Sequence, residues 1–357
     1  MNLNHLPAPP QKTYRIGAVG AGFIMRDVQL VAYRTAGFDV AAITAIPTSE
    51  AETAAELRGI SRVCNTLEEM LEDTSIEIVD IAVPPHFQLD IIRMAAAHKH
   101  IRGILAQKPL AVSYAQATET VKICKKAGVK LAVNQNMRYD QSIRALKTLL
   151  TRGDLGKPVL ATIEMRAIPH WQAWLEDYDR LTLLNMSIHH LDCFRFLFGD
   201  PESIYVSVAK DPRTKFTHRD GIALYILEYA NGMRASAWDD VWAGPAREGA
   251  AADLYIKWRV EGTDGMAQGT IGWPHYPNAV PSTIEYTTKS GTPHMSAPQW
   301  KEVWFPDAFA GPMGELMDSI AGDREPVIGG KDNLKTMALV EAAYRSVEEH
   351  RLVGLRE

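Results

Sequence analysis

From Tyr14 to about Ala132, short apolar runs alternate with segments of helical periodicity. Five of these runs predict buried strands: Arg15–Val19, Val40–Ala45, Ile76–Val83, Ile101–Ala106 and Lys130–Asn134. Continuous apolar runs are typical of parallel strands, because helices cover both faces of a parallel sheet. The alternation of strands with helices therefore predicts a series of βαβ units in this part of the chain.

The helices between these strands have recognisable ends. Thr66 with Glu69, and Ser113 with Gln116, fit the capping box that satisfies the first amide groups of a helix. Gly128 follows the second of these helices and suits the left-handed position just after a helix.

The pattern changes after Asn136. A helix is predicted near Gln141–Arg152, and later helices near Pro312–Ile320 and Lys331–Glu349. Between them lie predicted strands at Val159–Met165, Ser203–Val208, Ile222–Tyr229, Arg234–Ala237 and Leu254–Val260. Asn231-Gly232 marks a hairpin turn. Strands grouped together and flanked by helices predict an α+β second domain.

A narrow polar stripe runs along one apolar helical segment, Asn185–Asp192. At about 100° per residue, Asn185, His189 and Asp192 fall on one face of that helix. An amide, an imidazole and a carboxylate on an apolar helix are costly unless something satisfies them. Two interpretations remain: a core histidine bonded to Asp192, or an acid/base group that faces a substrate.

Composition narrows the class of protein. The 357 residues are 46% hydrophobic and 23% charged, which is typical of a globular protein with two domains. A net charge of −5 argues against a nucleic-acid surface. Three cysteines without metal or disulfide spacing favour a reducing cytoplasm, and no apolar run approaches the length of a membrane span. We expect a soluble, cytoplasmic protein whose residues 1–12 form a proline-containing arm.

A glycine turn follows the first predicted strand. Gly20 and Gly22 allow a tight turn and bring backbone amides against a pyrophosphate at the start of a helix. Met25 stands where a third glycine is usual. The second strand ends without the carboxylate that bonds the ribose of NAD, and Glu50 lies a few residues too far on. The pattern therefore predicts a dinucleotide, NAD or NADP, and leaves the choice between them open.

Lys108 comes just after the fourth strand and just before Pro109. The carboxyl ends of strands line the ligand crevice of an open α/β sheet, so Lys108 is a candidate for facing a bound cofactor. The alternative is an ordinary exposed loop lysine.

Several of these segments occur in the order of a known family. They are the glycine turn, Val83-Pro84-Pro85, Gln107-Lys108-Pro109, Asn134-Gln135-Asn136-Met137-Arg138, the polar stripe, Gly262-Thr263-Asp264-Gly265 and the C-terminal helix. In this set the chain resembles, over nearly its whole length, the family of glucose–fructose oxidoreductase and inositol dehydrogenase (Gfo/Idh/MocA). The resemblance implies an α/β Rossmann domain at 13–136 and an α+β domain at 137–357 with a large open, mostly antiparallel sheet. The C-terminal helices are candidates to pack back on the Rossmann domain.

The resemblance also implies roles for individual residues. Lys108 takes the place of the family's catalytic lysine, and Asn185 and His189 take the places of its Asp-x-x-x-His pair. The implied cofactor-binding residues are Gly20, Gly22, Phe23, Ile24, Val83, Pro84, Gln107, Lys108 and Asn136. The implied substrate-binding residues are Asp192, Asn185, His189, Arg138 and Trp171.

Two of these positions depart from the family pattern. Gln107 stands where glutamate is usual, and it keeps the ability to bond a carboxamide or a ribose. Asn185 stands where aspartate is usual, and it cannot raise the basicity of His189 as a carboxylate would. We therefore expect a differently tuned reaction or a different substrate.

The resemblance implies an NAD(P)-dependent dehydrogenase of a sugar, sugar derivative or cyclitol, assembled as a homodimer or homotetramer. In this hypothesis His189 takes the hydroxyl proton and Lys108 stabilises charge on the reacting oxygen. The adjacent His189 and His190 point about 100° apart and have no third ligand at sensible spacing, so no metal is expected. Two alternatives stay open: an enzyme that recycles its cofactor through oxidation, elimination or epimerisation, and reduction, or a non-enzymatic dinucleotide sensor.

Overall fold

The computed structural model describes residues 3–166, 173–213, 217–240, 255–272, 280–291 and 295–355. The chain forms two compact units. The Rossmann unit comprises Pro7–Asn136 and Pro306–Met337, and the sheet unit comprises Met1–Leu6, Met137–Phe305 and Ala338–Glu357. The chain therefore returns to the Rossmann unit near its C-terminus before it ends in the sheet unit.

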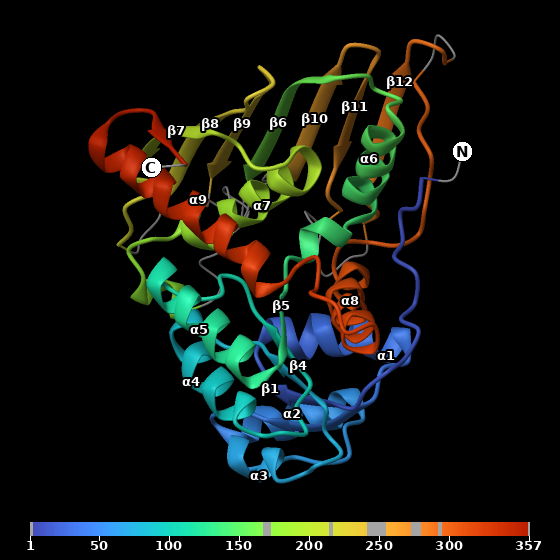
Figure 1. The fold of residues 1–357 in the computed structure, drawn as a ribbon, viewed down its shortest axis with the longest axis vertical. Coiled ribbons are helices and arrows are strands. Elements are labelled where there is room, and N and C mark those ends of the chain that lie inside the picture. Colours follow the sequence, from blue (N-terminus) through green and yellow to red (C-terminus); the bar gives the residue numbers. More distant parts are fainter. Residues whose placement is uncertain are drawn as a thin grey trace. The chain divides into compact units, whose positions relative to one another are not determined.

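The Rossmann unit contains a parallel sheet in the order β2-β1-β3-β4-β5. Figure 1 labels β1, β4 and β5 of this sheet. Its strands are β1 (Ile16–Val19), β2 (Val40–Thr44), β3 (Ile78–Ile81), β4 (Gly103–Ala106) and β5 (Lys130–Val133). Almost every strand residue is buried, which is the cause of the continuous apolar runs in the sequence. All five predicted strands are confirmed, each one to four residues shorter than expected.

Helices connect these strands: η1 (Ile24–Gln29), α1 (Leu30–Ala36), α2 (Thr48–Arg58), α3 (Leu67–Leu71), α4 (Pro85–Ala96) and α5 (Tyr114–Ala127). Helix α8 (Ala310–Ala321), from the later part of the chain, packs on β4 and β5. The hydroxyls of Thr66 and Ser113 accept hydrogen bonds from the amides of Glu69 and Gln116, so both residues cap their helices as predicted. The carboxylate of Glu69 accepts from the backbone amide of Asn65, one residue before the cap. Gly128 has a φ of 71° at the end of α5, as its position predicts.

The sheet unit is built on an eight-stranded sheet in the order β12-β11-β10-β6-β9-β8-β7-β13. Its strands are β6 (Pro158–Arg166), β7 (Ser203–Ala209), β8 (Ile222–Glu228), β9 (Arg234–Asp240), β10 (Tyr255–Gly262), β11 (Gly265–Thr270), β12 (Thr283–Thr288) and β13 (Val353–Gly354). Only the β6–β9 pair is parallel among the described strand pairs of this sheet, so the predicted mostly antiparallel sheet is confirmed. The expected Asn231-Gly232 turn joins β8 to β9.

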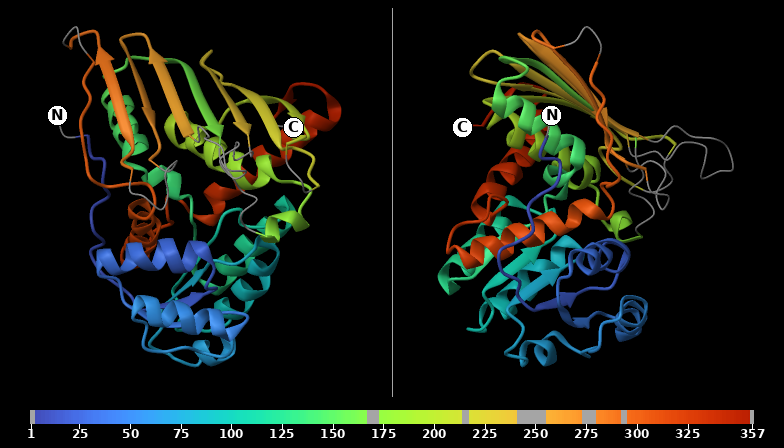
Figure 2. Two further views of the ribbon diagram at one scale, coloured as in Figure 1. Left: turned by 180° about the vertical axis from the view of Figure 1, so that it is seen from behind. Right: turned by 90° about the vertical axis from the view of Figure 1, so that its right-hand side faces the viewer.

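Helices cover one face of this sheet. Helix α6 (Gln141–Arg152) packs on β11 and β12, and α7 (Ser187–Phe198) packs on β9. Figure 2 shows the sheet edge-on in its right-hand view, with these green helices on one side of the strands. The opposite face carries the outward side chains of the strands. Helix α9 (Gly330–Glu349) begins in the Rossmann unit and ends in the sheet unit.

The remaining described helical segments are short. They are η2 (Asn136–Tyr139), η3 (Ala173–Asp177), η4 (Thr182–Met186) and η6 (Asp307–Phe309). None of the described helices is both long and apolar enough to cross a membrane.

Candidate functional site

The ends of three strands meet at the glycine turn. Gly20 follows β1 with a φ of 97°, and its amide donates to the carbonyl of Thr44 at the end of β2. A Cβ atom on Gly20 would lie 2.4 Å from the backbone oxygen of Ala82 and 3.1 Å from a methyl group of Val83. Only glycine fits there, because both the φ angle and the close approach exclude a side chain.

Gly22 differs from Gly20, because nothing in the described chain lies within 4 Å of the Cβ atom it would carry. Gly22 lies just before η1. Phe23, the N-cap of η1, and Ile24, its first residue, are half-buried. Space beside the amides at a helix N-terminus suits an anionic group that approaches the backbone closely. This cradle therefore fits the pyrophosphate of a dinucleotide.

A buried glutamine, Gln88, holds the backbone of the loop that carries Lys108. Gln88, on α4, accepts a hydrogen bond from the amide of Gln107 (2.7 Å). Its Nε2 atom donates to the carbonyls of Gln107 (3.0 Å) and Pro109 (2.8 Å). Helix α4 begins after Val83 and Pro84, so the same helix orders two predicted cofactor-binding positions and the lysine loop.

Burial lowers the pKa of Lys108 to about 7, far below the ordinary value of a lysine. Lys108 as a whole is half-buried, so solvent still reaches part of the residue. A lysine that titrates near neutral pH can exchange a proton with a substrate oxygen under physiological conditions.

We expect the amine of Lys108 to react with reductive methylation reagents half-maximally near pH 7. Only the neutral amine is nucleophilic, and a pKa lowered from 10.5 to about 7 makes the neutral form available at least two pH units earlier than in exposed lysines. Mass spectrometry of the labelled peptide over a pH series measures this. Labelling of Lys108 in step with exposed Lys99 across the series would contradict it.

Two buried amide side chains follow β5. The amide nitrogen and oxygen atoms of Asn134 and Gln135 have no hydrogen-bond partner within the described part of the chain. Asn136, the predicted cofactor contact, donates from its side chain to the carbonyl of Asn134 (3.1 Å). Unsatisfied buried amides are expensive, so they indicate a ligand with complementary donors and acceptors. The sequence prediction chose Asn136 and missed its two neighbours, although all three stand in one polar run after an apolar strand.

The polar stripe lies in the sheet unit, on two helical segments. Asn185 belongs to η4, a π-helical turn, and His189 and Asp192 belong to α7. All three residues are buried, with exposed fractions of 7%, 5% and 1%. The single α-helix expected over Asn185–Asp192 is therefore wrong in its first turn, since the π-turn adds residues to that turn.

The start of η4 is anchored by a buried carboxylate. Asp220 accepts hydrogen bonds from the amides of Leu181 (2.8 Å) and Leu183 (2.9 Å) and from the hydroxyl of Tyr344 (2.8 Å). These bonds satisfy amides that the helix start leaves open. They fix the segment that carries Asn185.

The two adjacent histidines have different surroundings. His189 packs edge-on against Trp304, with ring centroids 5.8 Å apart. The Nδ1 atom of fully buried His190 lies 2.9 Å from a carboxylate oxygen of Asp239, which also accepts a bond from Ser187. His190 therefore belongs to the packing between α7 and β9, and the two imidazoles do not act as a pair.

Asp192 forms a buried ion pair. The guanidinium of Arg138, on η2, donates to both its carboxylate oxygens, at 2.6 and 2.7 Å. The side chains are 7% and 2% exposed. This two-point contact joins η2 to α7 and brings together two predicted substrate-binding residues as partners of each other. Trp171, the remaining predicted substrate contact, lies outside the described residues.

The end of β2 bears on the choice between NAD and NADP. Ile46 is fully exposed there, and no carboxylate follows directly. Glu50 stands in the first turn of α2, and its carboxylate is 3.8 Å from the guanidinium of Arg26. The charges of Glu50 and Arg26 therefore offset each other, so this pair by itself favours neither NAD nor NADP.

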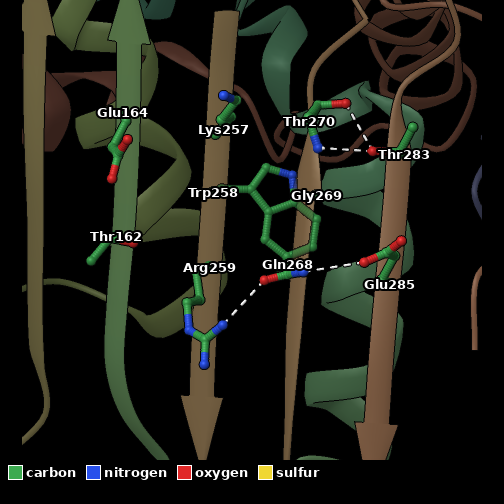
Figure 3. Close-up of a pocket in the computed structure, with 10 residues that line it drawn as sticks. All are labelled: Thr162, Glu164, Lys257, Trp258, Arg259, Gln268, Gly269, Thr270, Thr283 and Glu285. Atoms are coloured by element: carbon green, nitrogen blue, oxygen red, sulfur yellow. Dashed lines mark hydrogen bonds between the residues drawn. The ribbon is translucent and has the colours of Figure 1, made fainter. Parts of the chain in front are cut away.

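A shallow depression of about 420 Å³ lies on the outer face of the large sheet (Figure 3). Glu164, Lys257, Arg259 and Glu285 line it, and the ring of Trp258 is visible beside Gly269. None of the predicted site residues lines it.

Comparison with known proteins identifies both parts of the chain. Residues 14–135 match the family model described as an oxidoreductase family with an NAD-binding Rossmann fold. Residues 147–355 match the model of the same family's C-terminal alpha/beta domain.

Individual relatives are more distant. D-apiose dehydrogenase of Paraburkholderia graminis is 27% identical, over 97% of this chain and 90% of its own. Myo-inositol 2-dehydrogenase of Thermotoga maritima is 24% identical, over 96% and 99%. An oxidoreductase from Agrobacterium radiobacter, solved with NAD+, L-tartaric acid and magnesium, superimposes with a TM-score of 0.82 at 24% identity, over 97% of this chain and 99% of that one.

Proposed function

The chain belongs to the Gfo/Idh/MocA family of NAD-binding oxidoreductases, and from this we propose that it is a dehydrogenase of a sugar, a sugar derivative or a cyclitol. The substrate class rests on relatives named for apiose and inositol. The observation that carries the proposal is Lys108, a lysine with a pKa of about 7 at the carboxyl end of β4 in an NAD-binding fold.

The residues that would hold the dinucleotide lie in the Rossmann unit. Gly20, Gly22 and the start of η1 with Phe23 and Ile24 suit the pyrophosphate. The other positions lie at the ends of β3, β4 and β5: Val83, Pro84, Gln107, Lys108 and Asn136. A bound nicotinamide supplies the hydride acceptor or donor.

Lys108 and His189 divide the proton chemistry. Lys108 donates a hydrogen bond to the reacting oxygen and stabilises the negative charge that develops there. His189 accepts the hydroxyl proton when an alcohol is oxidised and returns it in the reverse direction. Asn185 bonds a neighbouring hydroxyl or orients His189, since an amide has both a donor and an acceptor but no charge.

Arg138 and Asp192 act in this proposal by holding α7 in place, because each satisfies the charge of the other. Direct contact with substrate is the role that the family resemblance implies for them. The two roles differ in what a substitution changes, stability or substrate affinity, and the Discussion uses that difference.

The test is a substrate panel with NAD and with NADP, followed by the absorbance of the reduced nicotinamide. The panel contains aldoses, sugar acids, inositols and glycosides. Turnover with any of them supports the dehydrogenase and identifies the preferred cofactor. Conversion that needs only catalytic amounts of NAD would replace it with the cofactor-recycling enzyme, and tight dinucleotide binding without any conversion would replace it with the sensor.

We further propose that the protein is cytoplasmic and forms a homodimer or homotetramer through the outer face of its large sheet. Tyr205 pairs with Ile226, and Leu224 pairs with Trp238, on adjacent strands of that face. The side chains of Tyr205, Leu224 and Ile226 are 43 to 51% exposed. Neighbouring exposed apolar side chains are typical of interaction surfaces.

The assembly predicts that Ile226→Glu shifts the protein to a smaller species. A carboxylate at the centre of an apolar interface loses its hydration and finds no partner, so the association constant of the subunits falls by about tenfold or more. Light scattering with size-exclusion chromatography measures the mass. Leu57→Glu, at an exposed apolar side chain on α2 of the Rossmann unit, is the matched control and should leave the mass unchanged. An unchanged mass for Ile226→Glu would move the interface elsewhere.

A further inference from the structure

A buried hydrogen-bond network lies beneath the lysine loop, wholly within the Rossmann unit. Asp80 is fully buried on β3, between the apolar residues Val79 and Ile81. Its carboxylate accepts bonds from the hydroxyl of Tyr33 (2.8 Å) and from Nε2 of Gln29 (2.7 and 2.9 Å). The apolar pattern of β3 does not explain Asp80, because burying a carboxylate inside a parallel strand costs free energy unless hydrogen bonds compensate it.

The network continues from Gln29 to Lys108. Nε2 of Gln107 donates to Oε1 of Gln29 (3.3 Å), and Oε1 of Gln107 accepts from the backbone amide of Lys108 (3.1 Å). Gln88 holds the same loop from its other side through the backbone of Gln107. The lysine loop is therefore connected by hydrogen bonds to a carboxylate on another strand.

A carboxylate gives this chain of amides a direction. Burial raises the pKa of Asp80 to about 7, so the carboxylate is ionised above that pH. The ionised form only accepts hydrogen bonds, and it then requires the NH₂ group of Gln29 to face it. The oxygen of Gln29 is then left for Gln107, which must turn its own NH₂ group toward Gln29. The oxygen of Gln107 in turn faces the amide of Lys108. The carboxylate of Asp80 at one end and the backbone N–H of Lys108 at the other, which can only donate, thus require the same orientation of the two amides between them.

We propose that Asp80 is a positioning residue, whose carboxylate orients Gln29 and Gln107 and thereby holds the loop that presents Lys108. The proposal rests on the proposed function for the role of Lys108, but not for the existence of the network. It also gives a reason for Gln107. A carboxylate at that position would face the oxygen of Gln29, so the charge at residue 80 and an amide at residue 107 belong together.

The test reverses the direction of the network. Asp80→Asn removes the charge, and Gln107→Glu places a second carboxylate against Gln29. In the double variant the carboxylate of residue 107 accepts from Gln29, and the oxygen of Gln29 accepts from the NH₂ group of residue 80. The two bonds of Gln29 are restored with opposite polarity, while the backbone amide of Lys108 still donates to residue 107 and the hydroxyl of Tyr33 to residue 80. The net charge equals that of the parent protein when Asp80 is ionised.

The first readout is the unfolding temperature of the protein without cofactor or substrate, at a pH above the pKa of about 7 of Asp80, where its carboxylate is ionised. We expect each single variant to lose about 3 °C or more, because a buried polar group loses its partner. The double variant should regain at least half of the summed loss. Asp177→Asn with Gln11→Glu is the matched control, since both residues are exposed and the charge exchange is the same. The control set should remain additive.

The second readout is turnover at saturating substrate. We expect each single variant to lose about tenfold in kcat with little change in KM, and the double variant to recover most of it. Additive losses of unfolding temperature would overturn the network. Recovery of unfolding temperature without recovery of kcat would overturn the positioning of Lys108 alone. If the substrate panel finds no conversion, the first readout still decides the network, so its failure and that of the dehydrogenase are separate results.

Discussion

Replacing Lys108 by methionine should lower kcat by about 100-fold or more, while the affinity for the dinucleotide stays within a few-fold of the parent protein. Methionine keeps the length and the apolar stem of lysine but cannot donate a proton or a hydrogen bond. The pKa of about 7 indicates that Lys108 exists in both protonation states near neutral pH, as a group that shares a proton with a substrate must. Steady-state kinetics on a substrate from the panel, together with titration of NADH fluorescence, measure the two quantities.

Lys99→Met is the matched control, because Lys99 is exposed and belongs to the same unit. It should leave kcat unchanged. Unaltered kcat in Lys108→Met would remove this lysine from the reaction. A large loss of dinucleotide affinity with unaltered kcat at saturation would assign it to cofactor binding alone.

The sequence was most informative where burial is continuous or where a turn has a single chemical solution. The five strands of the Rossmann unit were predicted because both of their faces are covered. Helix α6 has its predicted bounds, and in the structure Asp140 caps its start and Gly153 its end. Gly20 was identified from the glycine turn, and the structure gives the reason for it, since its φ and the carbonyl of Ala82 exclude other residues.

Strands β11 and β12 were missed because their sequences are short and polar. Threonine, glutamine and glutamate occupy their outward positions, and Gly269 replaces a side chain where the ring of Trp258 packs. A strand of this kind is stabilised by its neighbours in the sheet rather than by its own apolar pattern. Such a strand leaves no apolar run to recognise.

The supporting residues of the candidate site were missed for a different reason. Asp80, Gln29 and Gln88 act through partners that are 19 to 78 residues distant in the chain, counting the bonds from Gln88 to Gln107, from Gln29 to Asp80 and from Gln107 to Gln29. Helical or strand spacing cannot reveal such pairs. The available signal was a charged residue inside an apolar strand, Asp80, and that signal indicates a buried network without naming its members.

Replacing Asp192 by asparagine should destabilise the protein by about 3–5 kcal/mol, which corresponds to an unfolding temperature lower by on the order of 10 °C. The guanidinium of Arg138 is nearly buried and would lose both of its hydrogen bonds to charged oxygens. Arg195, 3.9 Å from the same carboxylate, would lose a second favourable interaction. Differential scanning calorimetry measures the change.

Two further variants separate the ion pair from its alternatives. Arg138→Met together with Asp192→Leu removes both charges, so it should cost much less than Asp192→Asn, where a buried charge stays without its partner. Asp179→Asn breaks an exposed pair with Arg219 in the same unit and should cost about 1 kcal/mol or less. If Asp192→Asn instead raises KM strongly while the unfolding temperature stays unchanged, the carboxylate serves the substrate. That result would restore the role that the family resemblance implies for Asp192, and it would transfer the anchoring of α7 to the bonds of Asp239 with His190 and Ser187.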